Sequence, residues 1–317
     1  MRTFFRSLFE LIRKIASNRL VLTGASIIAA LAVLALAAPL AKSGGLLRDP
    51  LAQFKDGLDG DDMPLSPGSR FKLGSDALGR DELSRLIFGA RVSLAVGLAS
   101  MLTATLIGLT IGMIAGYFGK WIDQALMRLT EIMMAMPALL LGAAFAGFMD
   151  GRVLHLHPSW IHSHVLDFKL QQGVVSIFLL IGMLVWTGIV RLVRAEVIVI
   201  KERQYVQAAR AFGASSLRIM LAHILPNILP TLLIVAAMST ASAILLEVSL
   251  SYLGIGAVQL PNPSWGLMIR EGQPYFISSP HVVLVPGAAI VLTVLGFNLL
   301  GEGLRQVFDP LHRTRAI

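Results

Sequence analysis

Residues 21–40 read VLTGASIIAALAVLALAAPL, an apolar run without a single charged side chain. A helix that crosses the hydrocarbon core of a bilayer needs about 20 apolar residues, and this run meets that length. Further apolar runs follow at 92–118, 125–148, 174–190, 230–256 and 282–301. The sequence therefore predicts an all-α integral membrane protein with about six transmembrane helices.

The overall composition excludes a water-soluble globule. The chain is 55% hydrophobic and 15% charged, whereas typical soluble domains are roughly 25% charged. The mean hydropathy is +0.73, which leaves too few polar residues to cover a water-facing surface. The chain has no cysteine, so disulfide scaffolds, cysteine-ligated metal centres and thiol catalysis are excluded.

The distribution of Lys and Arg predicts the orientation. The net charge is +8, and the basic residues lie mainly at the ends of apolar runs, where they meet lipid headgroups and not nucleic acid. They concentrate in 1–19, 191–218 and 305–315, whereas 149–173 and 257–281 hold only Arg152, Lys169 and Arg270. The positive-inside rule therefore places both termini and the 191–229 loop in the cytoplasm.

Four regions are expected along the chain. Residues 1–20 are predicted to form a cytoplasmic amphipathic helix in the headgroup layer, because their apolar residues recur at helical spacing. The alternative is that this segment does not lie on the membrane and serves only as the positively charged cytoplasmic flank of the first span. Residues 21–40 form the first span, which we expect to remain uncleaved. A periplasmic loop follows at 41–91, and 92–317 form a core of five spans.

Glycine repeats at every fourth position of the second apolar run, at Gly108, Gly112 and Gly116. These three residues lie on one face of a helix, where the lack of side chains lets a neighbouring backbone approach closely. The repeat predicts a helix-packing surface and not a substrate contact.

The segment 205–227, YVQAARAFGASSLRIMLAHILPN, is the most informative stretch. Ala208 and Ala209 favour a helix, and Gly213 ends that helix or permits a sharp bend. Ser215 or Ser216 can cap a second short helix, which we expect to stop at Pro226. Two short helices joined by a glycine bend would form a compact knob outside the membrane.

This segment resembles the EAA loop of binding-protein-dependent ABC importer permeases. The match rests on Ala208, Ala209, Gly213, Leu225 and Pro226, and the departures are Gln207 in place of Glu and His223 in place of Ile. A generic amphipathic loop between spans is the alternative. The resemblance implies that these seven residues contact an ATPase subunit, although Gln207 lacks the charge that a salt bridge would need.

Four flanking stretches narrow the resemblance. They are LGSDALGRDELSRLIFGAR at 73–91, LGIG at 253–256, PNPSWG at 261–266 and NLLGEGLR at 298–305. They are similar to dipeptide, oligopeptide and nickel permeases, and most similar to the second permease of dipeptide and oligopeptide systems. The implied function is ATP-driven import of small peptides by alternating access, with nickel, glutathione or another small solute as alternatives.

The resemblance also implies the assembly. It predicts the type I ABC importer permease fold in a bacterial inner membrane, paired with a second permease subunit, two ATPases and an external binding protein. ATP and Mg would be held by the ATPases. The chain itself shows no P-loop, H-E-x-x-H or G-x-S-x-G motif, so we expect neither a bound cofactor nor enzymatic activity. A stand-alone secondary transporter is disfavoured by the charges clustered at span ends.

Two regions outside the 205–227 segment are candidate contacts. Asp81 is a plausible cap for a short helix that displays Leu83, Leu86 and Ile87. Arg80, Arg85 and Trp265 would lie at the outer surface, where they either dock the binding protein or pack loops together. Both interpretations remain open on sequence alone.

Charges inside the apolar runs have two interpretations each. Glu247 is costly in a membrane unless it faces protein, water or a base, so it is either a substrate-pathway residue or a buried hydrogen-bond hub. Glu131 follows Arg128 by three residues and predicts an intrahelical ion pair.

Two clusters suggest metals only weakly. His155, His157, His162 and His164 form a candidate site between the third and fourth spans. A solvated loop is the default, so no metal is expected. Asp59, Asp61 and Asp62 lack the Glu that completes a calcium loop and indicate a solvated linker.

Overall fold

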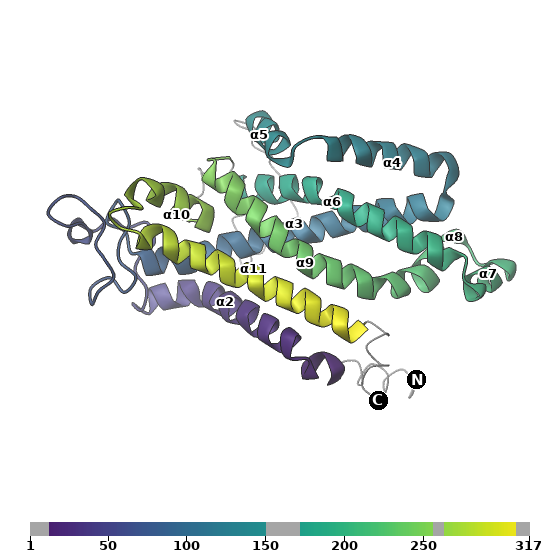
Figure 1. The fold of residues 1–317 in the computed structure, drawn as a ribbon, viewed down its shortest axis with the longest axis horizontal. Helices are drawn as coiled ribbons and strands as arrows, with labels where there is room; N and C mark the ends of the chain where they lie inside the picture. The colour runs from purple at the N-terminus through teal and green to yellow at the C-terminus, as the bar shows by residue number, and fades with distance from the viewer. Residues whose placement is uncertain (1–12, 150–171, 256–262, 309–317) are drawn as a thin grey trace, which may run out of the picture.

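The structure is a computed structural model that describes residues 13–149, 172–255 and 263–308. Within these ranges the chain folds into helices and two isolated β-bridges. Residues 13–17 are helical, whereas the rest of the amphipathic helix predicted for 1–20 lies outside the described residues. The five long helices run side by side along the longest axis of the molecule (Figure 1): α2 (Arg19–Ser43), α3 (Glu82–Phe118), α6 (Gln172–Lys201), α9 (Leu225–Tyr252) and α11 (His281–Phe308).

Short elements occupy the two ends of this bundle. One end, the loop end, carries α7 (Gln204–Ala211), α8 (Ser216–Arg218) and the π-helix η2 (Ile219–Ile224). The other, the cap end, carries the 44–81 loop with η1 (Lys55–Gly57), then α10 (Trp265–Gly272) and η3 (Gln273–Tyr275). At one side, α4 (Lys120–Ala135) leads into α5 (Ala138–Met149) (Figure 1).

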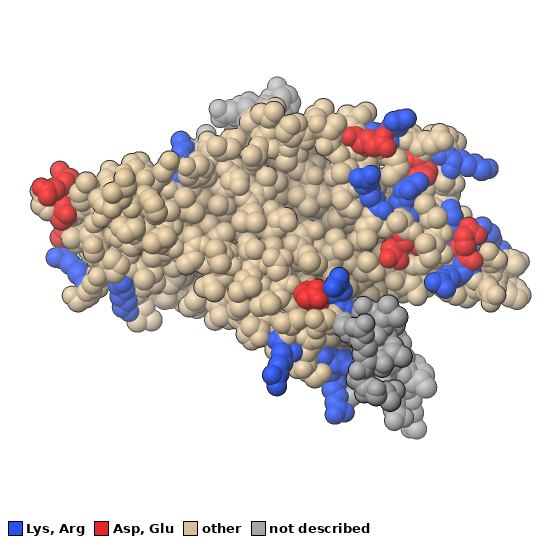
Figure 2. All heavy atoms as spheres, viewed as in Figure 1, with Lys and Arg blue, Asp and Glu red and all other residues tan. Residues whose placement is uncertain are grey.

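The helices have the length and apolarity of membrane spans. Five of them are long and apolar enough to cross a bilayer, and the α4–α5 pair brings the count to six if it is one broken span. Charged side chains gather toward the two ends of the molecule, and a broad uncharged band lies between them (Figure 2). The predicted all-α membrane fold is therefore confirmed.

The predicted span at 125–148 is not one continuous helix. It is split between α4 and α5, whose axes meet at 89°. Pro137 lies at the break, and it has no N–H to donate to the carbonyl four residues earlier. The residue before a proline is pushed out of the α region, and Met136 accordingly has φ −86° and ψ 128°. A hydropathy window cannot detect this bend because every residue around it is apolar.

The most extensive helix contact joins α3 to α6. Gly108, Gly112 and Gly116 face the side chains of Ile189, Val193 and Val197, in that order. A Cβ atom added to any one of the three glycines would lie 2.7 Å from the Cβ of its partner, where no carbon fits. The predicted packing role of this repeat is confirmed, because the missing side chains let the two helices touch.

A second glycine contact seats α2 against α11. A Cβ on Gly24 would lie 2.5 Å from the carbonyl oxygen of Gly296, so these helices also meet at backbone level. Asn18 caps α2, since its side-chain oxygen accepts hydrogen bonds from the amides of Leu20 and Val21, and its side-chain nitrogen donates to Gln306 of α11 at 3.3 Å. Together these contacts hold the first span on the outside of the core helices.

Asp81 caps α3 as predicted, but the helix is long. Its carboxylate accepts a hydrogen bond from the amide of Ser84 at 2.9 Å. The helix then continues without a break from Glu82 to Phe118 for 37 residues. The short surface helix expected here is therefore wrong, because no proline lies between Glu82 and Phe118 to end the helix.

We expect Gly112→Ala to destabilise the α3–α6 contact. The new methyl group would overlap Val193, and overpacking of this kind costs about 1–3 kcal/mol. Thermal unfolding of the purified protein in detergent should show a lower midpoint. Gly188→Ala on α6 is the matched control, because a Cβ there meets nothing within 4 Å. Equal midpoints for the two variants would contradict this packing.

Candidate functional site: the loop end and an outer hollow

The loop between α6 and α9 has the helix–bend–helix form that its sequence predicts. Gly213 follows α7 with φ +80°, a backbone conformation that residues with a Cβ rarely adopt. Ser215 then caps α8, since its hydroxyl accepts a hydrogen bond from the amide of Arg218 at 3.4 Å. Both features confirm predictions made from the residue types alone.

The predicted helix end at Pro226 is wrong. The chain continues from α8 through the π-helix η2 into α9, with Pro226 in the first turn of α9. In η2 the amide of Leu225 donates to the carbonyl of Met220, five residues earlier. The first turn of a helix tolerates proline, because its missing N–H would have no partner there. Asn227 contributes its side-chain amide, which donates to the carbonyl of His223 at 2.7 Å.

The π-helix fixes one face of the loop onto the bundle. Ile219 and Ile224 are five residues apart and both are fully buried. In a regular α-helix they would point about 140° apart, so the wider turn is what brings them to one side. With Val206 of α7 they join an apolar cluster that contains Val193, Val197 and Ile200 near the end of α6. The loop is therefore anchored to α6 and does not hang free.

The opposite face of the loop is exposed and partly apolar. Phe212 is 92% exposed, and Tyr205, Leu217 and Leu221 are also exposed. Single exposed apolar side chains are common, but several on one loop indicate an interaction surface. Sequence reasoning missed Phe212, although its position directly before the bend at Gly213 was a usable signal.

The predicted coupling residues share this region but differ in accessibility. Gln207, Ala208, Gly213 and Pro226 are exposed, whereas Ala209, His223 and Leu225 are half-buried. Gln207 donates to the backbone carbonyl of Glu202 at 3.2 Å. Thus the side chain at the position where the resemblance calls for Glu bonds within its own loop.

Charged side chains at this end form ion pairs and hydrogen bonds, two of which join α6 to its neighbouring helices. Arg194 of α6 forms two hydrogen bonds with the carboxylate of Asp123 on α4, at 2.5 and 2.6 Å. Lys201 donates to the carbonyl of Gly116 at 2.8 Å, which links α6 to α3. The predicted pair of Arg128 and Glu131 is also present, at 3.0 Å, and it is exposed.

At the cap end, the residues predicted to dock a partner are mostly turned inward. Arg80 and Arg85 each donate to the carboxylate of Glu271 in α10, at 2.6 and 2.5 Å. Trp265 is fully buried and donates from its indole to the carbonyl of Leu86 at 3.0 Å. The interpretation of Arg85 and Trp265 as surface contacts is corrected, because both join α10 to α3.

Glu247 lies inside the protein. Its side chain is 0% exposed, and one carboxylate oxygen accepts a hydrogen bond from Ser251 at 2.7 Å. The hydroxyls of Ser93 on α3 and Ser264 at the start of α10 lie near the same carboxylate, but its second oxygen, Oε2, has no hydrogen-bond partner among the described residues. This geometry favours the hydrogen-bond hub over the pathway residue.

The candidate metal site is not placed. His155, His157, His162 and His164 lie outside the described residues. Among the residues that the structure does describe, no group of three or more His, Asp or Glu side chains is arranged to hold a metal ion.

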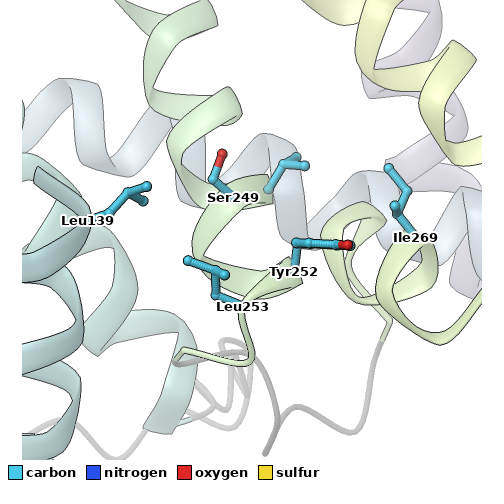
Figure 3. A pocket seen from close by; sticks show the side chains of 6 residues that line it. Leu139, Ser249, Tyr252, Leu253 and Ile269 are labelled. Atoms are coloured by element: carbon cyan, nitrogen blue, oxygen red, sulfur yellow. The ribbon is translucent and has the colours of Figure 1, made fainter. Parts of the chain in front are cut away.

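A hollow opens between α5, α9 and α10 toward the cap end. Figure 3 shows side chains from all three helices around it. Its volume is about 300 Å³, and its lining comprises Leu139, Val248, Ser249, Tyr252, Leu253 and Ile269. Glu247 is not part of this lining, because it points from α9 toward α3 and α10. Sequence reasoning missed this hollow, and the only signal for it was Pro137, which turns α5 across the end of α9.

Several transport permeases are similar in sequence to this chain over most of its length. A dipeptide transport system permease from Alkalihalophilus pseudofirmus is 35% identical over 95% of this chain and 89% of its own length. A di/tripeptide transport system permease from Pseudomonas aeruginosa is 38% identical over 84% of this chain and 82% of its own. A glutathione transport system permease from Pectobacterium atrosepticum is 36% identical over 80% of this chain and 76% of its own length.

The fold has a solved counterpart. A chain from the inward-facing MetNI methionine ABC transporter matches with a TM-score of 0.52 over 72% of this chain and 98% of that one, at 21% identity. The type I permease fold implied by the sequence is thereby confirmed. The family described as binding-protein-dependent transport system inner membrane component matches residues 108–314. This chain belongs to that family and is a multi-pass inner-membrane permease subunit of an ABC importer.

Proposed function

We propose that this permease imports di- and oligopeptides. The support is chemical as well as comparative: two of the relatives carry di- or tripeptides by name, and a third carries glutathione, which is itself a modified tripeptide. Glutathione is therefore the second candidate cargo. Nickel would need ligands, and the four histidines that could supply them lie outside the described residues.

The proposed complex contains a second permease subunit, two ATPases and an external binding protein. ATP and Mg are held by the ATPases, and this chain carries no catalytic step. The loop end and both termini face the cytoplasm, which is consistent with the Lys and Arg side chains gathered there (Figure 2). The cap end then faces the periplasm, where the binding protein delivers its cargo.

The observation that carries the coupling role is the two-sided α7–α8 loop. Its inner face is tied to α6 by Val206, Ile219 and Ile224, and its outer face presents Phe212. A partner that grips the outer face can therefore move α6 and α9 through the inner one. ATP-driven closure of the ATPases would pull on this loop, and the helices would reorient to open the pathway inward.

Phe212 would contribute most of the apolar contact with the ATPase. Burying a phenylalanine side chain stabilises a contact by about 1.5–3 kcal/mol, which corresponds to roughly 10- to 100-fold in affinity. The exposed alanine at position 208 would allow close approach beside it. Neither residue supports the fold of the isolated chain, so substitutions here separate binding from stability.

We expect Phe212→Ala to weaken ATPase retention by roughly 10-fold or more, and to reduce transport in parallel. Co-purification of the ATPase with the tagged permease measures the first effect, and uptake by membrane vesicles the second. Leu284→Ala is the matched control, because Leu284 is exposed and lies in the first turn of α11, which packs on α10 at the cap end. Full ATPase retention and transport in the Phe212 variant would refute the proposed contact.

The bend at Gly213 provides a separate test. Its φ of +80° disfavours side chains, yet a Cβ there has open space around it. Asn tolerates this conformation better than β-branched residues do, so Gly213→Asn should retain most transport while Gly213→Val loses most of it. Both variants should insert normally in the membrane. Equal transport by the two variants would show that the bend is not needed for coupling.

Cargo is tested by uptake in cells that lack the gene, with and without its restoration. Labelled dialanine, trialanine, glutathione and nickel ion are offered in parallel. The proposal predicts that restoration recovers peptide uptake. Recovery of glutathione uptake alone would select the second candidate, and recovery of nickel uptake alone would contradict peptide import.

A further inference from the structure

The break between α4 and α5 lies where a lipid-facing helix could not tolerate it. α4 has 16 residues and is about 24 Å long, and it meets α5 at the break of a single bent span when the two helices are counted as one. Interrupted backbone within a span is found only where protein covers it or where it lines a water-filled cavity. The α4–α5 corner is therefore expected to face protein or water.

The hollow described above lies directly beside this corner. Leu139 is two residues beyond Pro137, and it forms one wall opposite α9 and α10 (Figure 3). The polar groups in the lining are Ser249, whose hydroxyl donates to the carbonyl of Leu245, and Tyr252, whose hydroxyl donates to Gln273 at 2.9 Å. The six lining side chains carry no charge. The volume of about 300 Å³ lies at the lower end of the range for ligand pockets.

We propose that this hollow is the part of the translocation pathway that this chain supplies, and that it receives an uncharged side chain of the peptide in transit. The proposal rests on peptide import as proposed above. An apolar wall with two hydroxyls can contact the aliphatic and aromatic side chains of a peptide. It offers no charged partner for the amino and carboxyl termini of that peptide. Weak, uncharged contact suits a passage, because a site on a pathway must release what it binds.

Ser249 sets the size of the hollow. It is the smallest lining side chain, and its hydroxyl donates to a carbonyl of its own helix, so replacing it breaks no hydrogen bond between helices. Glu247, two residues earlier, faces the other side of α9 and keeps its bond to Ser251. A larger side chain at position 249 would therefore fill the hollow and leave the buried hub intact.

The first experiment measures water access in the complete transporter, reconstituted in proteoliposomes with its ATPases, partner permease and binding protein. The chain has no native cysteine, so Ser249→Cys introduces one thiol whose labelling is read by the mass of this subunit. We expect a charged, water-soluble thiol reagent to modify it, and diphenylalanine to slow that reaction at least five-fold.

Val291→Cys is the matched control for the first experiment. Val291 lies on α11, which is 64% exposed at this position and contributes nothing to the hollow. In the bilayer it should not react. A thiol at position 249 that is as unreactive as the one at 291 would overturn the proposal and would assign the hollow to lipid or to a tight protein contact.

The second experiment fills the hollow. Ser249→Phe should lower diphenylalanine uptake about ten-fold while dialanine uptake falls less than two-fold, with the ATPases and partner permease still co-purifying. Equal loss of both cargoes together with loss of the partner permease would overturn the proposal and identify an interface between permeases. Unchanged uptake of both would also overturn it.

The two experiments separate the inference from the function on which it rests. If the wild-type transporter imports neither dipeptide, peptide import is contradicted. The reactivity of the thiol at position 249 then decides alone whether the hollow opens to water. If the wild type imports both and Ser249→Phe fails to discriminate, only the inference about the hollow is wrong.

Discussion

The backbone-level contact between α3 and α6 is the constraint on which the remaining structure depends. Three glycines remove the side chains that would keep these helices apart, and the surfaces of Ile189, Val193 and Val197 fill the space. The same residues of α6 continue into the cluster that receives the α7–α8 loop. Thus the spacing of two spans determines where the loop is seated.

Polar groups inside this apolar protein are used to join elements. Burial of a charge is costly unless it is paired, and Arg85 meets both Asp76 and Glu271. Glu247 is also buried, and its one hydrogen bond among the described residues comes from Ser251 of the same helix. The ion pairs of Arg85 fix α10 across the end of α3, which shapes one wall of the hollow. Their positions are therefore architectural, although their effect reaches the pathway that we propose.

Much of this organisation could be predicted from the sequence. Apolar runs located the spans, the glycine repeat located the α3–α6 contact, and the residues around Gly213 and Ser215 predicted the bend and the cap. Each of these signals is local, because it depends on residues within one or two helical turns. A local sequence preference is retained in the folded structure when no contact with a distant part of the chain opposes it.

The errors arose where the outcome depends on distant partners or on backbone geometry. Arg85 looked like a surface charge because its acceptor, Glu271, is 186 residues away. The bend at Pro137 was hidden by uniform hydropathy. The π-helix was hidden because its cause is the need to bury Ile219 and Ile224 on one side, which sequence spacing alone does not reveal. Phe212 was overlooked because its exposure follows from the bend beside it.

The α7–α8 loop is connected differently to the two long helices on either side of it, α6 and α9. Its connection to α6 is stiff, because α6 is locked to α3 along three glycines and braced by Arg194 and Lys201. Its connection to α9 runs through the π-helix η2, in which the amide of Leu225 donates to a carbonyl five residues earlier. In the coupling that we propose, a force on the tip of the loop would therefore act on both α6 and α9, to which the loop is connected. The far end of α9 carries Ser249 and Tyr252, so in the coupling that we propose the same helix connects the loop end to the wall of the hollow.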